Sequence, residues 1–153
     1  MFSLIITIIA IALVAALALA SIYYGGSAFN KGSEKAAAST LINNAMQVSA
    51  AMTLAEVEGV TPAAGAVDGS HNLVTGNYLS GAVNGLSIGT TGNVVGTPSS
   101  QAVCDAVNAQ SDHTDTAAAA NAAAAEAVLA AMTDAQFGCE TADDDTLTFV
   151  FKH

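Results

Sequence analysis

Positive charge is nearly absent from this 153-residue chain. It contains no arginine, and its three lysines (Lys31, Lys35 and Lys152) stand against 13 acidic residues, for a net charge of −10. A nucleic-acid-binding face needs a basic stripe that neutralises phosphates. The composition therefore argues against a direct nucleic-acid site and indicates an acidic surface exposed to water.

Large aromatic residues and cysteines are also scarce. Tryptophan is absent and aromatics make up 5% of the residues, while alanine and glycine are abundant, so we expect a small, closely spaced core. Cys104 and Cys139 are the only cysteines, and they fit one disulfide in an oxidising compartment. Two unpaired buried thiols are the alternative. A metal centre would need more cysteine or histidine ligands close together, so we expect no metal and no cofactor.

One long hydrophobic run is present. Phe2 to Tyr24 contains no charged residue, no proline and no glycine. As a helix these residues would extend about 34 Å, enough to cross a hydrocarbon core of about 30 Å. A cleaved signal peptide is the alternative, but its apolar core is shorter and follows basic residues, which are missing here. We therefore favour a membrane anchor that stays in the working protein.

The helical pattern weakens at Gly25-Gly26 and then resumes. Two adjacent glycines cost about 2 kcal/mol of helix propensity relative to alanine, so the chain could bend, melt or extend there. From Ser33 to Gly59 the pattern is amphipathic. Spacings of four and three residues place one apolar set on a single helix face, namely Leu41, Ala45, Val48, Met52 and Ala55. Met46 and Met52 are both expected in the core. The first sixty residues thus predict one long helix, or two halves hinged at the glycines.

The rest of the chain mixes short strands with helices. Between residues 61 and 98, regularly spaced glycines separate short apolar runs, which predicts strands that include residues 71–74 and a hairpin over 87–95. A disordered linker is the alternative. A helix is expected to begin at Ser99 or Ser100, and a second to cover residues 115–132. Residues 146–151 alternate as a strand, with Leu147, Phe149 and Phe151 on one side.

In combination and order, these features resemble the type IV pilins. The run FSLIITIIAIALVAALALA at residues 2–20 is similar to the start of a mature pilin whose basic leader has been removed by a prepilin peptidase. SSQAVCDAV at residues 99–107, Cys139 and the closing TLTFVFK are similar to the disulfide region of the type IVb members.

The resemblance implies an α+β fold. A long N-terminal helix, apolar in its first half and amphipathic in its second, would pack on a small antiparallel β-sheet, followed by a C-terminal disulfide-bounded region. The expected parts are an apolar transmembrane and filament-core helix (1–28), an amphipathic helix half (29–59) and a globular head (60–153) that holds the disulfide-bounded region 104–139.

It also implies a mechanism of assembly. Met1 would carry an N-methylated α-amino group, and Gly25 and Gly26 would allow the helix to melt locally. The residues expected to pack in the filament core are Phe2, Leu4, Ile5, Ile6, Ile8, Ile9, Leu13 and Leu17. Pilins usually carry a glutamate at the fifth mature position, whereas this chain has Ile5 and no carboxylate before Glu34. A charge pair that would set the register between subunits is therefore missing.

We expect a structural subunit that polymerises into an extracellular filament serving adhesion, motility, DNA uptake or conjugation. Its partners would be copies of itself, the inner membrane before assembly, and the pilus assembly machinery. A membrane-anchored minor pilin or secretion pseudopilin, acting as a monomeric binding module, is the alternative. We do not expect an enzyme, because the three histidines are scattered and SDHTD at residues 111–115 is typical of a solvated turn.

Overall fold

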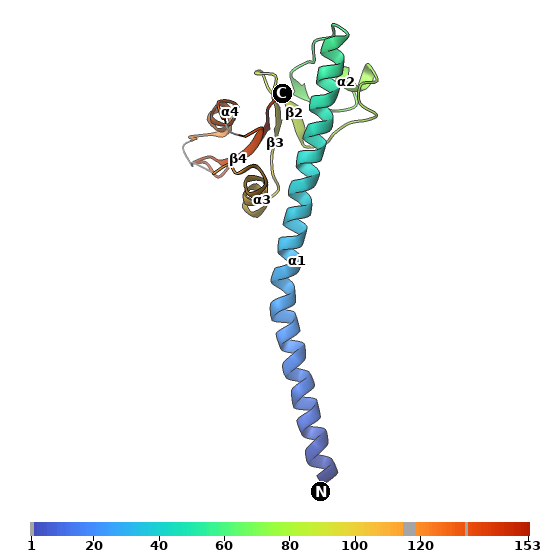
Figure 1. Cartoon of the computed structure of the whole chain (residues 1–153), viewed down its shortest axis with the longest axis vertical. Helices are drawn as coiled ribbons and strands as arrows, with labels where there is room; N and C mark the ends of the chain where they lie inside the picture. The colour runs from blue at the N-terminus through green and yellow to red at the C-terminus, as the bar shows by residue number, and fades with distance from the viewer. Residues whose placement is uncertain (1, 115–118, 134) are drawn as a thin grey trace. The chain divides into compact units, whose positions relative to one another are not determined.

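The computed structural model describes residues 2–114, 119–133 and 135–153 (Figure 1). Its first element is a single helix of 56 residues, α1 (Phe2–Val57). The helix runs without a break through Gly25 and Gly26, so the continuous alternative is the one observed. Apart from the adjoining backbone of the helix, a Cβ atom at either glycine would meet no atom of the described residues within 4 Å, so contacts with the rest of the described chain do not require glycine at these positions.

The chain divides into two compact units after Glu34. The first unit contains the apolar part of α1. The second unit, residues 35–153, contains the amphipathic part of α1 and all the strands; we call it the head unit. The amphipathic part of the helix therefore folds together with the domain that follows it.

The head unit is built on a five-stranded antiparallel sheet with the strand order β1-β2-β3-β5-β4. This confirms the expected α+β class with a small antiparallel sheet. The last strand of the sequence lies inside the sheet, paired with β3 on one side and β4 on the other. The strands are β1 (Gly65–Ala66), β2 (Leu86–Ile88), β3 (Val94–Gly96), β4 (Phe137–Thr141) and β5 (Leu147–Phe151).

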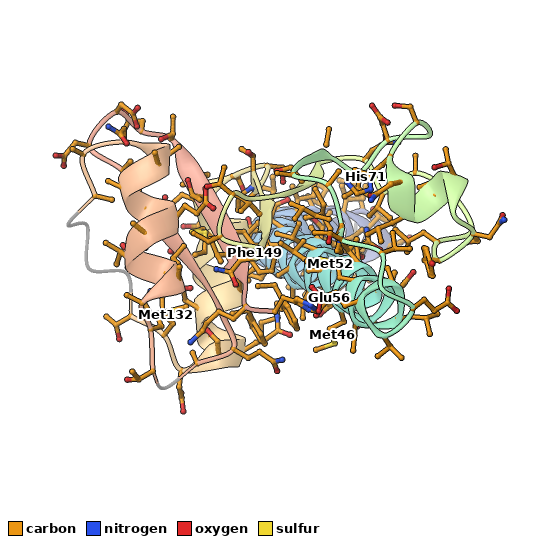
Figure 2. All side chains as sticks on the ribbon, turned by 90° about the horizontal axis from the view of Figure 1, so that it is seen from above. Met46, Met52, Glu56, His71, Met132 and Phe149 are labelled. Atoms are coloured by element: carbon orange, nitrogen blue, oxygen red, sulfur yellow. A yellow bond between two sulfur atoms is a disulfide. The ribbon has the colours of Figure 1, made fainter. Side chains whose placement is uncertain are left out.

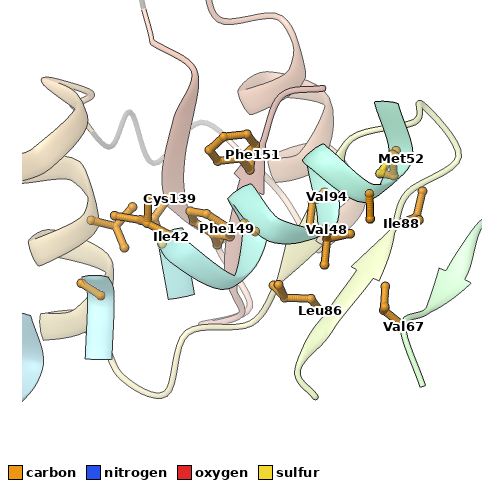
Figure 3. Packing of buried hydrophobic residues seen from close by; sticks show 14 of the residues in the cluster. Ile42, Val48, Met52, Val67, Leu86, Ile88, Val94, Cys139, Phe149 and Phe151 are labelled. Atoms are coloured by element: carbon orange, nitrogen blue, oxygen red, sulfur yellow. The ribbon is translucent and has the colours of Figure 1, made fainter. Parts of the chain in front are cut away.

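The amphipathic part of α1 packs its apolar stripe against one face of the sheet. Val48 and Met52 are buried in one cluster with Phe149 of β5 (Figure 3). The predicted helix face is therefore correct. Met46 was expected in the core and is instead 44% exposed, because it follows Ala45 by one residue and so lies about 100° further round the helix (Figure 2).

The opposite face of the sheet is covered by α4 (Ala122–Ala130), which contacts β4 and β5. Leu147, Phe149 and Phe151 belong to the α1-side cluster, as their alternation predicts. Val150 is buried as well, as is Leu129 of α4. The C-terminal strand thus has both faces covered and fixes the end of the chain.

Two predictions of secondary structure were wrong. Residues 71–74, expected as a strand, begin the short helix α2 (Asn72–Thr75), because His71 Nδ1 accepts the Leu73 N–H and caps the turn while Leu73 is buried. The helix expected from residue 115 begins at Ala122. Asn121 caps the helix by accepting the Ala124 N–H. Just before it, Ala119 forms an isolated parallel β-bridge with Ala142. Residues 115–118 lie outside the described residues.

Other local predictions were confirmed. The hairpin over 87–95 is formed by β2 and β3, with Gly92 at φ +83°, a value that favours glycine at the turn. The helix expected after Ser99 or Ser100 is α3 (Gln101–Ser111), and Ser100 is its cap. The Ser100 side chain accepts the Val103 N–H, and Val103 and Val107 are both buried.

Candidate functional site

The most unusual surface of the chain is the apolar part of α1. Phe2–Tyr23 is a 22-residue stretch with none of its most apolar window buried. The eight residues expected to pack in a filament core are all between 53% and 84% exposed. By length and composition this helix could cross a membrane, and a signal sequence has the same properties.

The hydroxyl of Thr7, a polar side chain within this segment, is hydrogen-bonded to the helix itself. Thr7 Oγ1 donates to the Leu4 carbonyl at 2.8 Å and lies 3.3 Å from the Ser3 carbonyl. A helix that satisfies its own hydroxyl in this way presents little unmet hydrogen-bonding demand to lipid or to another helix. Position 5 carries Ile5, so no carboxylate is available there. Met1, whose N-methylation the resemblance implies, lies outside the described residues.

The disulfide expected from the sequence is present and joins two different elements. Cys104 of α3 and Cys139 of β4 are bonded, with their Cα atoms 5.4 Å apart and both residues fully buried. The alternative of two unpaired thiols is therefore wrong. The bond closes a loop with a sequence separation of 35 residues. The chain-entropy model assigns about 4 kcal/mol to a loop of this size.

Asn108 supports the disulfide, and sequence reasoning missed it. Its side-chain Nδ2 donates to the Cys139 carbonyl at 2.8 Å, and its Oδ1 accepts the Cys139 N–H at 2.8 Å. Asn108 is buried and lies one helical turn after Cys104. The available signal was a polar residue four positions after a cysteine, which places both side chains on the same face of a helix.

A second missed contact joins the segment after α3 to the sheet. His113 Nε2 lies 2.9 Å from Glu140 Oε1, and the Glu140 side chain is completely buried. The solvated turn predicted for residues 111–115 is wrong for the His113 side chain, whereas Asp112 and Thr114 on either side of it are exposed. Its ring packs over Gly138, where an added Cβ would come within 2.9 Å of His113 Cδ2.

The C-terminal residue is held against α1 by polar contacts. His153 Nδ1 lies 3.0 Å from Ser49 Oγ, and its Nε2 lies 3.4 Å from Glu56 Oε2. Its backbone N–H donates to Asn93 Oδ1 at 3.2 Å. These contacts join the last residue to both the helix and the β2–β3 hairpin.

The Ser49, His153 and Glu56 contacts have the connectivity of a hydrolytic triad but lack its surroundings. Ser49 lies in the interior of α1, where the neighbouring backbone N–H groups are used in helical hydrogen bonds. A hydrolytic triad needs backbone N–H groups that stabilise the oxyanion of the tetrahedral intermediate. In this described stretch of α1, no pair of N–H groups is free to do so. The arrangement is suited to holding His153 against α1.

The acidic turn before β5 is organised by its own hydrogen bonds. The Asp144 carboxylate accepts the Thr146 side-chain hydroxyl and the Thr146 N–H, and these bonds hold the pKa of Asp144 below its usual 3.8. Asp145 has φ +61°. Among the described residues, no group of three or more histidine, cysteine or acidic side chains is placed to hold a metal ion.

A groove of about 550 Å³ lies beside this turn on the head unit. Its lining comes from β3 and the segment after it, from the first turns of α4, and from the start of β5. Most of the lining is apolar or small, including Val95, Pro98 and Leu147, and the carboxylates of Glu126 and Asp145 belong to it as well.

No family model, curated protein or solved structure matches this chain at a significant level.

Proposed function

We propose that this chain is the structural subunit of an extracellular filament of the type IV pilus kind, and that it polymerises through the apolar part of α1. The observation that carries the proposal is the exposed, uncharged surface of Phe2–Tyr23, attached to an acidic head unit that contains a disulfide. The resemblance to type IV pilins supports it through the order of the same parts along the chain.

The apolar surface would have two alternative environments. Before assembly it lies among lipid chains, where its side chains are solvated at little cost. After extraction it is buried against copies of itself. Burying one large apolar side chain is worth about 1.5–3 kcal/mol relative to water, so a bundle of these helices resists dissociation outside the membrane.

Close approach between the helices is favoured by small residues spread along the segment. Such residues allow the backbones of packed apolar helices to come near one another. They are Ala10, Ala12, Ala15, Ala16, Ala18 and Ala20. Because a head-to-tail contact between identical subunits does not close on itself, repetition of this contact produces a fibre.

The head unit has properties suited to the outside of such a fibre. Of the 13 acidic residues, all but Glu34 lie in the head unit, so the charge is concentrated in the part that faces water. The buried Cys104–Cys139 bond favours an oxidising compartment. Both properties are compatible with a cell-surface location after passage through the inner membrane.

A second function is favoured by one specific observation, the isoleucine at position 5. Without a carboxylate in the apolar segment, the helix lacks a polar group that would pair with a neighbouring subunit and set the register. This favours a membrane-anchored minor pilin or pseudopilin, which acts as a monomeric assembly or binding module.

The test is electron microscopy of material sheared from the surface of cells that make the protein, with identification by mass spectrometry. Long, thin filaments composed chiefly of this chain are the expected result. If the chain is found only in the membrane fraction, with none in the sheared material, the main-subunit proposal fails and the anchored-module function replaces it.

A further inference from the structure

Two of the three lysines are exposed on α1 at the boundary between the apolar and amphipathic parts. Lys31 and Lys35 are four residues apart, so they lie on the same helix face one turn apart. Within the described residues, neither forms a salt bridge. The third lysine is already engaged, because Lys152 Nζ donates to the Met132 carbonyl inside the head unit.

The groove beside the acidic turn has the composition that a lysine side chain needs. A lysine places its aliphatic stem along apolar surface and keeps its ammonium group next to water or a carboxylate. Val95, Pro98 and Leu147 supply apolar surface. Glu126 is half-buried and Asp145 is exposed, so both carboxylates are available from the side open to solvent.

The two carboxylates differ in how firmly they are placed. Glu126 Oε1 accepts the Thr91 hydroxyl at 3.4 Å, and it lies so close to Gly89 that a Cβ there would be 2.2 Å away. The backbone of Asp145 is held in the left-handed region, and its N–H donates to the Ala142 carbonyl at 3.0 Å. The groove therefore has carboxylates from α4 and from the turn before β5, and that of Glu126 is held by a hydrogen bond.

We propose that Lys31 and Lys35 of one copy dock into this groove on a second copy of the chain. Charge complementarity selects the occupant. The head is strongly acidic, and among the contacts of the described residues Lys152 is engaged by the Met132 carbonyl whereas Lys31 and Lys35 form no salt bridge. The contact rests on the proposed filament. It supplies an inter-subunit charge pairing that fixes register, a role that Ile5 cannot fill.

A double-mutant cycle on full-length protein in cells tests the pairing. One variant carries Lys31→Met and Lys35→Met, which keep the apolar stems. A second carries Glu126→Gln and Asp145→Asn, since asparagine tolerates the left-handed backbone. A third combines all four substitutions. The readout is the guanidinium concentration at which half of the sheared filaments stop sedimenting.

Each pair of substitutions should lower that midpoint, and the combined variant should be no weaker than the weaker pair, because the contact can be lost only once. The control, Asp105→Asn with Asp112→Asn, removes the same charge at exposed head positions outside the groove and leaves the midpoint unchanged. Asp112 has φ +58°, so this control also matches the backbone of Asp145. Additive losses, or no loss in either pair, overturn the docking.

Cross-linking gives a second, independent readout. Gly32→Cys with Ala123→Cys places one thiol beside the two lysines, which are both kept, and one in the groove lining, both at exposed positions. The native cysteines are already bonded to each other, so new disulfides come from the introduced thiols. The two single-cysteine variants control for bonds between like cysteines and should give no ladder. A ladder of covalent oligomers on a non-reducing gel is expected. Monomers alone from filaments that do form would overturn the docking.

The outcomes separate this inference from the function on which it rests. Absence of filaments from unmodified cells defeats the proposed function and the docking together. Filaments that are insensitive to the lysine and carboxylate substitutions defeat the docking alone.

Discussion

The carboxylate of Glu140 and the ring of His113 form a contact of 2.9 Å, with Glu140 completely buried in β4. A buried carboxylate is retained only where partners compensate for its lost hydration. In the described part of the chain, every buried side-chain nitrogen or oxygen has a hydrogen-bond partner. His113 therefore ties the segment after α3 to the sheet through a group that the fold cannot leave unpaired.

Replacing His113 with alanine should destabilise the head unit by about 3 kcal/mol, because a buried carboxylate loses one of its partners. Thermal or guanidinium unfolding of the purified protein in detergent measures the loss. His113→Gln, which keeps a side-chain donor, should recover part of it. Equal stability of His113→Ala and the unmodified protein would contradict this account of the contact.

The disulfide allows a second prediction, separate from that for the Asn108 side chain bonded to the Cys139 backbone, which we call the Asn108 clamp. The double substitution Cys104→Ala with Cys139→Ala should lower the free energy of unfolding of the head unit by about 4 kcal/mol, since the closed loop no longer restricts the unfolded chain. Guanidinium titration followed by circular dichroism measures it. Adding a reductant to the unmodified protein should approach the same midpoint, and an unchanged midpoint in both experiments would refute the prediction.

Asn108→Ala tests the Asn108 clamp separately from the disulfide. It leaves the Cys139 N–H and carbonyl without their side-chain partner in a buried site, which should cost about 2 kcal/mol even though the disulfide remains. The matched control is Gln110→Ala, an exposed position in the same helix whose side chain bonds only a helix carbonyl. If the two variants unfold at the same midpoint, the Asn108 bonds contribute nothing measurable.

The sequence predicted the fold more completely than the polar contacts, for physical reasons. Apolar periodicity placed Val48, Met52 and Phe149 correctly, because burial of large side chains repeats with the helix or strand period. The residue-71 segment was misassigned because a histidine cap, which depends on a local side-chain bond, overrode a weak strand pattern. The same limitation hid His113 and Glu140, which are 27 residues apart and meet only in the folded chain.

The candidate site divides in the same way. The apolar helix surface and the cysteine pair could be predicted from the sequence, because the apolar residues are consecutive and the chain has two cysteines. The groove beside the acidic turn could not be predicted, because its lining comes from three segments that are distant in sequence. Glu126 and Asp145 are brought together by the packing of α4 on the sheet, which residue patterns did not specify.

The acidic turn predicts a pH dependence. The Thr146 hydroxyl and N–H lower the pKa of the Asp144 carboxyl below 3.8 in the folded state. A depressed folded pKa contributes stability that is present above the unfolded pKa and is lost as the pH falls through the folded value. Melting temperatures measured from pH 5 down to pH 2 should therefore fall less steeply for Asp144→Asn than for the unmodified protein. Parallel curves would contradict the assignment.

The sharpest prediction for the filament concerns a single charge in the apolar segment. Ile8→Lys or Leu13→Lys should abolish filaments, because a charge buried among packed apolar helices has no partner there and costs several kcal/mol. Ile8→Leu and Leu13→Ile, which preserve apolar volume, should assemble normally. The head unit should remain folded in all four variants, since neither residue belongs to it. An intact Cys104–Cys139 bond, seen as unchanged mobility on a non-reducing gel, checks this. Cell fractionation shows whether the lysine variants still reach the membrane, which separates failed assembly from failed insertion. Normal filaments from a lysine variant that inserts would exclude α1 packing as the basis of polymerisation.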